Sequence, residues 1–102
     1  MEKRKLVFIL MGLEKLNNME KPENIVTDSE LENVWGNANF GPYWNEHKRD
    51  FLNNTMLKVA TQYESGSTAK YIVIKLGLVK EDWTFAQKGR DYLLAVFFKG
   101  QP

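Results

Sequence analysis

The sequence predicts one mainly helical domain that also contains a small β-hairpin, which is an α+β fold. Apolar residues recur at helical spacing in three stretches of the second half of the chain. These stretches are roughly residues 46–63, 68–76 and 87–98. Between the last two, residues 78–80 and 83–85 are short apolar segments that flank the turn-like pair Glu81-Asp82, as in a hairpin. The length of 102 residues suits a single domain with a modest core.

We divide the chain into an N-terminal segment, residues 1–26, and a domain formed by residues 27–102. The segment begins with basic residues and an apolar run, residues 6–13, which lacks an A-x-A-like cleavage site and is too short to cross a bilayer. We therefore expect a cytoplasmic protein that has no membrane partner. The polar stretch that follows, residues 14–24, contains Pro22 and favours a loop or a frayed helix.

The first helix of the domain has a well-marked start. The Thr27 hydroxyl at the N-cap and Glu30 three residues later form the pattern of a capping box. Apolar residues at helical spacing follow, and Gly36 ends this short helix. Residues 37–44 are rich in turn-forming residues, with a Gly-Pro pair as the strongest break, and predict a connector.

Each of the three later helices has an expected inner face. These faces are Leu52, Met56, Val59, Ala60 and Tyr63; Ala69, Ile72, Val73 and Leu76; and Tyr92, Leu93, Val96 and Phe97. Gly66 is expected to adopt the left-handed conformation that ends the first helix, and Gly77 is expected to end the second. At Gly89 a small residue would let the last helix approach the preceding strand closely.

Composition excludes several classes of site. Cysteine is absent, so the chain has no disulfide, no thiolate nucleophile and no cysteine-based zinc site. His47 is the only histidine, and a metal site needs more nitrogen or sulfur ligands than this one residue supplies. The sequence contains no phosphate-binding loop, dinucleotide-binding glycine motif or nucleophile-elbow motif. We therefore expect no catalytic residue, no metal and no cofactor, and a protein that is not an enzyme.

Charge is distributed unevenly along the chain. The formal net charge is +1, but residues 1–44 carry five basic and seven acidic side chains, whereas residues 45–102 carry nine basic and six acidic ones. Contacts with phosphate groups need clustered lysine and arginine side chains. Any nucleic-acid surface is therefore expected in the second half of the chain.

Two motifs in the second half of the chain resemble parts of a known fold. GSTAKYIVIKLGLV at residues 66–79 resembles the second helix of the winged helix-turn-helix motif, and TFAQKGRDYLLAVF at residues 84–97 resembles the segment that follows the wing in many bacterial members. The likeness covers about residues 53–98 and implies a winged helix-turn-helix-like fold. The stretches ELENVWGNANFG, NTMLKVATQYESGSTA and KGRDYL also resemble small proteins of enterobacterial phages and prophages that have no assigned function.

The winged-helix resemblance implies a DNA-binding protein, and the phage resemblance implies a regulator of phage or prophage transcription. The helix at residues 68–76 would then enter the major groove of double-stranded DNA. The expected nucleic-acid contacts are Ser67, Thr68, Lys70, Tyr71, Lys75, Lys80, Lys88 and Arg90. Two features oppose this function. The helix offers no Arg, Asn or Gln for paired base contacts, and Glu81 and Asp82 would repel phosphate.

A second function stays open on part of the same surface, namely a non-enzymatic interaction protein that binds, and could inhibit, a host protein. Apolar side chains facing out of the helix at 68–76, together with the N-terminal apolar run, would form such a surface or the seam of a homodimer. For the N-terminal run, packing on its own domain is the plainer alternative to a homodimer seam, and we favour it slightly. The expected contacts are Tyr71, Ile74, Leu6, Val7, Phe8 and Ile9. Two roles would explain the aromatic residues: they form part of the core, or they form a base-stacking platform. We favour the core. These residues are Trp35, Phe40, Tyr43, Trp44 and Trp83.

Overall fold

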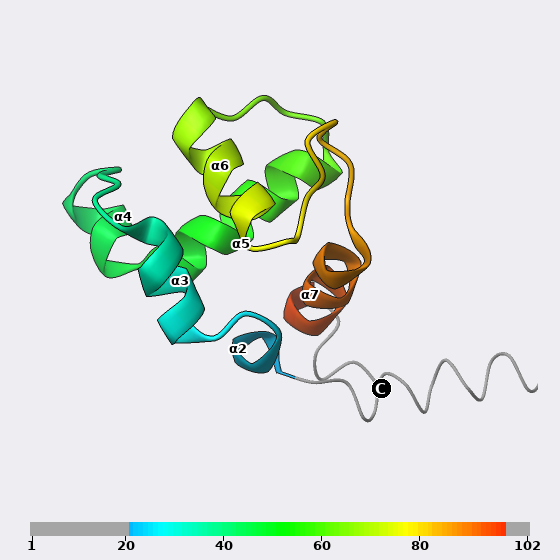
Figure 1. Ribbon diagram of the computed structural model, residues 1–102, viewed down its shortest axis with the longest axis horizontal. Coiled ribbons are helices and arrows are strands. Elements are labelled where there is room, and N and C mark those ends of the chain that lie inside the picture. Colours follow the sequence, from blue (N-terminus) through cyan, green and yellow to red (C-terminus); the bar gives the residue numbers. More distant parts are fainter. Residues whose placement is uncertain (1–20, 98–102) are drawn as a thin grey trace, which may run out of the picture.

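The computed structural model describes residues 21–97, and within them the chain forms six helices (Figure 1). The helices are α2 (Pro22–Ile25), α3 (Asp28–Trp35), α4 (Pro42–Glu46), α5 (Lys48–Ala60), α6 (Ser67–Lys75) and α7 (Gln87–Phe97). They hold 65% of the described residues, so the prediction of a mainly helical chain is correct.

Helix α5 lies at the centre of the fold. It packs against α3, α4, α6 and α7, while α3 also contacts α6, and α2 lies against α7. Figure 1 shows α5 crossing the middle of the molecule, with α6 and α7 on different sides of it. The inner side of α6 therefore faces α5 and α3.

One apolar core joins α3, α5, α6, α7 and the connectors between them. Its buried members are Val26, Leu31, Trp35, Leu52, Met56, Val59, Ile72, Val73, Leu76, Leu78, Val79 and Tyr92. The expected inner face of α6 is confirmed in full, since Ala69, Ile72, Val73 and Leu76 are all buried. Val26 is fully buried, so the last residues of the segment 1–26 take part in the fold.

Two predicted helix ends are confirmed. The backbone N–H of Glu30 donates to the Thr27 hydroxyl at 3.1 Å, and the backbone N–H of Thr27 donates to the Glu30 carboxylate at 3.2 Å, which completes the capping box of α3. At the end of α6, Gly77 has a φ of 78°, and the N–H of Leu78 donates back to the carbonyl of Val73 at 3.0 Å. The glycine thus turns the chain sharply so that Leu78 enters the core.

The expected β-hairpin is not formed, and the winged helix-turn-helix fold that depends on it is wrong for the described residues. Between α6 and α7 the chain makes one isolated antiparallel bridge, from Val79 to Phe85, and no strand. Trp83 has a left-handed φ of 67°, which interrupts the extended segment expected there. The Asp82 carboxylate accepts hydrogen bonds from the backbone N–H and the hydroxyl of Thr84, and this favours a turn over a ladder.

The boundaries predicted around α5 also need correction. The stretch 37–44 is only partly a connector, because Pro42 occupies the first turn of α4, where its missing N–H costs nothing. The helix expected at 46–63 is shorter, and its left-handed terminal residue is Gln62 with a φ of 62°. Gly66, for which that role was expected, has a φ of −64° and is the N-cap of α6.

Three residues expected on inner faces lie outside the core. Tyr63 is exposed because it lies beyond the end of α5, and Ala60, the last residue of that helix, is exposed as well. Phe97, at the end of α7, is 41% exposed, whereas Leu93 and Val96 pack partly against the core. The spacing of apolar residues therefore predicts too long an inner face at the C-terminal ends of α5 and α7.

The close approach expected at Gly89 is present, although its partner is the α6–α7 connector rather than a strand. A Cβ atom at Gly89 would lie 2.0 Å from the carbonyl oxygen and 2.9 Å from the carbonyl carbon of Leu78. Both atoms belong to the backbone, so α7 would have to move away from the core to make room. Glycine at this position fixes the distance between α7 and the connector.

We expect Gly89→Ala to lower the free energy of unfolding by about 2 kcal/mol or more, because the methyl group meets a buried backbone. Urea unfolding of the wild-type and variant chains measures this difference. Gly66→Ala is the matched control, since a Cβ there meets no atom within 4 Å, and its effect should stay under about 1 kcal/mol. Equally small effects at both glycines would contradict the close packing of α7.

Candidate functional site

The outer face of α6 carries most of the residues expected to bind a partner. Ser67, Thr68, Tyr71 and Lys75 are exposed, and the Tyr71 side chain is 56% exposed. Ile74 is only half-buried, because it packs against the core while it borders this face. The opposite side of the helix is buried against α5 and α3, so these outward residues are positioned by a well-anchored helix.

Lys70, expected to contact DNA, already has two partners within the chain. Its ammonium nitrogen lies 2.9 Å from a carboxylate oxygen of Glu64 and 5.3 Å from the centre of the Trp83 ring. The Glu64 side chain is 85% exposed, so the ion pair contributes little to stability. A phosphate group would have to compete with the Glu64 carboxylate for Lys70.

The remaining expected basic contacts do not gather into one basic surface. Lys88 lies 3.5 Å from the Glu30 carboxylate, so it faces α3 rather than the Glu64–Trp83 side that Lys70 faces. Lys75, Lys80 and Arg90 are exposed and form no ion pair with another described residue.

Carboxylates offset the lysines of this region. Hydrogen bonds from the Thr84 hydroxyl and backbone N–H lower the pKa of Asp82, and the charge of Lys80 acts in the same direction. Residues 64–86 contain three lysines and three carboxylates, and residues 21–97 contain nine basic and ten acidic side chains. The positive balance expected for the second half of the chain is therefore absent from residues 64–86.

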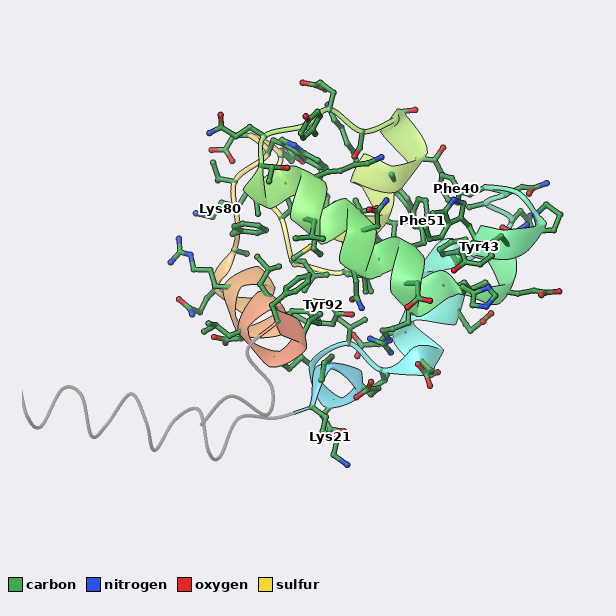
Figure 2. The ribbon with its side chains drawn as sticks, turned by 180° about the vertical axis from the view of Figure 1, so that it is seen from behind. Lys21, Phe40, Tyr43, Phe51, Lys80 and Tyr92 are labelled. Carbon is green, nitrogen blue, oxygen red and sulfur yellow. The ribbon has the colours of Figure 1, made fainter. Side chains whose placement is uncertain are left out.

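Of the five aromatic residues expected in a core or a base-stacking platform, Trp83 packs against the core from the connector between α6 and α7. Phe40 and Tyr43 lie near Phe51 at one end of the molecule (Figure 2). The Trp35 and Phe40 rings lie 5.2 Å and 4.1 Å from the ring of Phe51, so the core interpretation holds for them. Tyr43, in contrast, is 58% exposed and stacks on the His47 ring at 4.2 Å. Phe51 was not among the aromatic residues expected in this cluster, because its position within a long helix gives no sign of it.

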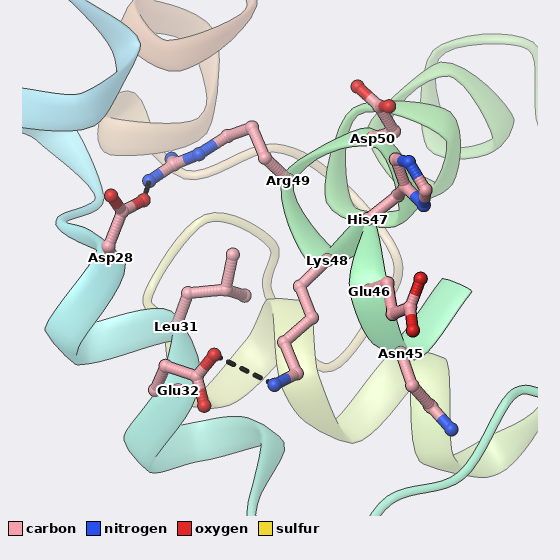
Figure 3. Close-up of a pocket in the computed structure, with 9 residues that line it drawn as sticks. All are labelled: Asp28, Leu31, Glu32, Asn45, Glu46, His47, Lys48, Arg49 and Asp50. Carbon is pink, nitrogen blue, oxygen red and sulfur yellow. Dashed lines mark hydrogen bonds and ion pairs between the residues drawn. The ribbon is translucent and has the colours of Figure 1, made fainter. Parts of the chain in front are cut away.

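A surface pocket of about 440 Å³ lies between α3 and the start of α5 (Figure 3). Its lining residues are Asp28, Leu31, Glu32, Asn45, Glu46, His47, Lys48, Arg49 and Asp50. Lys48 pairs with Glu32 at 2.7 Å and Arg49 pairs with Asp28 at 2.6 Å, so both cations are occupied by carboxylates of α3. His47 donates through Nδ1 to the Tyr43 carbonyl oxygen at 2.7 Å. The two ion pairs that line the pocket thus join α3 to α5.

Neither a metal cluster nor a membrane-spanning helix is seen in the described part of the chain. No group of three or more His, Cys, Asp or Glu side chains in residues 21–97 is placed to hold a metal ion. No helix there is both long and apolar enough to cross a bilayer. Residues Leu6, Val7, Phe8 and Ile9, expected as protein contacts, lie outside the described residues.

Comparison of the chain with protein-family models, with curated proteins and with solved structures found no match. The function proposed below therefore depends on the residues of the chain itself.

The lowered pKa of Glu30 predicts how the free energy of unfolding changes at acidic pH. The backbone N–H of Thr27 donates to it and, with help from the charge of Lys88 and against a contribution from burial, holds its pKa below the ordinary value of 4.5. Because the folded-state pKa is lowered, the stabilisation is present above pH 4.5 and is lost as the pH falls through the folded-state value.

We expect Glu30→Gln to make the unfolding free energy less dependent on pH below 4.5 than in the wild-type chain. Chemical denaturation at a series of pH values measures this dependence. Glu46→Gln is the control, because Glu46 is exposed and forms no ion pair with another described residue. An identical change in both variants would show that the capping box does not carry the effect.

Proposed function

We propose that this chain is a non-enzymatic binding protein that contacts another protein through the outer face of α6. The observation that carries the proposal is Tyr71, a large aromatic side chain that is 56% exposed at the middle of a helix anchored on its other side. Tyrosine is enriched at the centres of protein interfaces because it covers a large area and loses little conformational freedom on binding.

The surroundings of Tyr71 support an interface centre. Half-buried Ile74 adds apolar surface beside it, and the hydroxyls of Ser67 and Thr68 supply hydrogen-bonding groups on the first turn of the same helix. Such a mixture of an aromatic centre and a polar margin is typical of protein–protein contacts.

Charge favours a protein partner over DNA at this face. Residues 64–86 contain three lysines and three carboxylates, and one of these lysines, Lys70, is paired with Glu64. Binding to the DNA backbone depends on an excess of positive charge that displaces counterions. Residues 64–86 lack such an excess.

Quantitative affinity capture tests the proposal. The full chain is immobilised and exposed to lysate of an enterobacterial host, the class of cell suggested by the phage resemblance. We expect at least one host protein to be retained by the wild-type chain and by Tyr43→Ala, and to fall about tenfold or more with Tyr71→Ala. Tyr43 is the matched control because it is equally exposed but lies on α4. Retention that is the same for all three chains would contradict the proposal.

DNA binding is the second candidate, favoured by the exposure of Ser67, Thr68 and Lys75 on a helix that follows α5 along the chain. Fluorescence anisotropy with mixed duplex DNA at low and near-physiological salt separates the two candidates. Binding that falls steeply with salt, and that is weakened by Lys75→Ala but not by Lys58→Ala on α5, would support DNA as the partner. Absence of binding at low salt would eliminate it.

A further inference from the structure

Two stacked rings are exposed where α4 meets α5. The rings of Tyr43 and His47 lie 4.2 Å apart at an interplanar angle of 15°, and the Tyr43 side chain is 58% exposed. The ring of Trp44 lies 5.0 Å from that of Tyr43 and 5.6 Å from that of Phe51, and Phe51 packs against the core. The exposed ring pair is therefore held in place by contacts that continue into the core.

Two carboxylates flank this ring pair. Glu46 directly precedes His47, and Asp50 lies about one helical turn after it. Both carboxylates are exposed, and neither forms an ion pair with another described residue. Lys48 and Arg49 lie between them in the sequence, but both cations pair with carboxylates of α3, at 2.7 Å and 2.6 Å (Figure 3). The charge left at the ring pair is therefore negative.

Other carboxylates of the described chain lack this arrangement. Glu81 and Asp91 also form no ion pair, but they directly follow Lys80 and Arg90, which have no ion-pair partner among the described residues either. A cationic partner at those two carboxylates would meet a positive charge beside each of them. The formal net charge of the whole chain is +1, so the chain as a whole does not attract cations. Charge complementarity therefore selects the ring pair.

We propose that the surface formed by Tyr43, Glu46, His47 and Asp50 binds an arginine-rich segment of another protein. A guanidinium group is planar and cationic, so it stacks on the Tyr43 ring while it pairs with a carboxylate. Lysine suits the surface less well, because its ammonium group is more strongly hydrated and does not stack. Phosphate groups would be repelled by the two carboxylates. The inference is independent of the proposed function, because none of these residues belongs to α6.

Titration of the isotope-labelled full chain with a capped hexa-arginine peptide at low salt, followed by amide NMR, tests the proposal. We expect saturable shifts that are centred on residues 42–51. The Kd should rise about twofold to fivefold with Tyr43→Ala, which is the loss expected for one exposed cation–π contact. Glu46→Gln and Asp50→Asn should each weaken binding and make it less dependent on salt. A hexa-lysine peptide should bind more weakly than the hexa-arginine peptide.

Three variants are matched controls. Tyr63→Ala removes a tyrosine that is 69% exposed between α5 and α6, and Glu81→Gln removes an exposed carboxylate without an ion pair in the described chain. Both should bind the peptide as the wild-type chain does, and so should Tyr71→Ala, which separates this surface from that of α6. Amide spectra verify that each variant is folded.

Two outcomes would overturn the proposal. One is the absence of saturable binding at low salt. The other is binding that Tyr43→Ala leaves unchanged and that is equally strong for the two peptides, because such binding depends on charge alone and not on the exposed ring.

Discussion

The arrangement of the helices depends on the hydrogen bonds of the buried Tyr92 hydroxyl. The Tyr92 side chain is fully buried, and its hydroxyl donates to the Asn53 side-chain oxygen at 2.6 Å and accepts from an Arg49 nitrogen at 3.3 Å. Arg49 also donates to Asp28 at 2.6 Å, so one network joins α7, α5 and α3. Burial opposes the charge of Arg49, but its hydrogen bonds to Tyr92 and Asp28 outweigh burial and raise its pKa. For Tyr92, burial raises the pKa, so its hydroxyl stays protonated and able to donate.

This network explains which surfaces of the chain are left for partners. With α3 held to α5, the two helices together cover the inner side of α6, and its Tyr71 side is turned outward. With Tyr92 directed into the core, the Arg90 and Phe97 side of α7 must face outward as well. The outward positions of Tyr71 on α6 and Phe97 on α7 are thus two consequences of the same packing.

Local signals in the sequence identified α3, α5, α6 and α7, but not α4 or the structure of the connector between α6 and α7. The Thr27–Glu30 capping box, the apolar spacing of α6 and the left-handed glycine at residue 77 involve residues close in sequence, and each is present. The predicted β-hairpin is absent because Trp83 has a left-handed φ and the Asp82 carboxylate accepts hydrogen bonds from Thr84, and neither feature was expected from the sequence. Lys88 pairs with Glu30 across 58 residues and Arg49 with Tyr92 across 43, and no spacing rule predicts such pairs. The sequence therefore identified Tyr71 as exposed but could not show that two of the expected DNA contacts were already paired.

A double-mutant cycle between Arg49 and Tyr92 tests the central claim most directly. Urea unfolding of the wild-type chain, Tyr92→Phe, Arg49→Met and the double variant yields the coupling free energy between the two side chains. We predict a coupling of about 0.5–3 kcal/mol, because each single change leaves a buried polar partner without its hydrogen bond and the double change removes both. Additive effects, with a coupling close to zero, would show that the two side chains act independently and that the network does not hold α7 and α3 on α5.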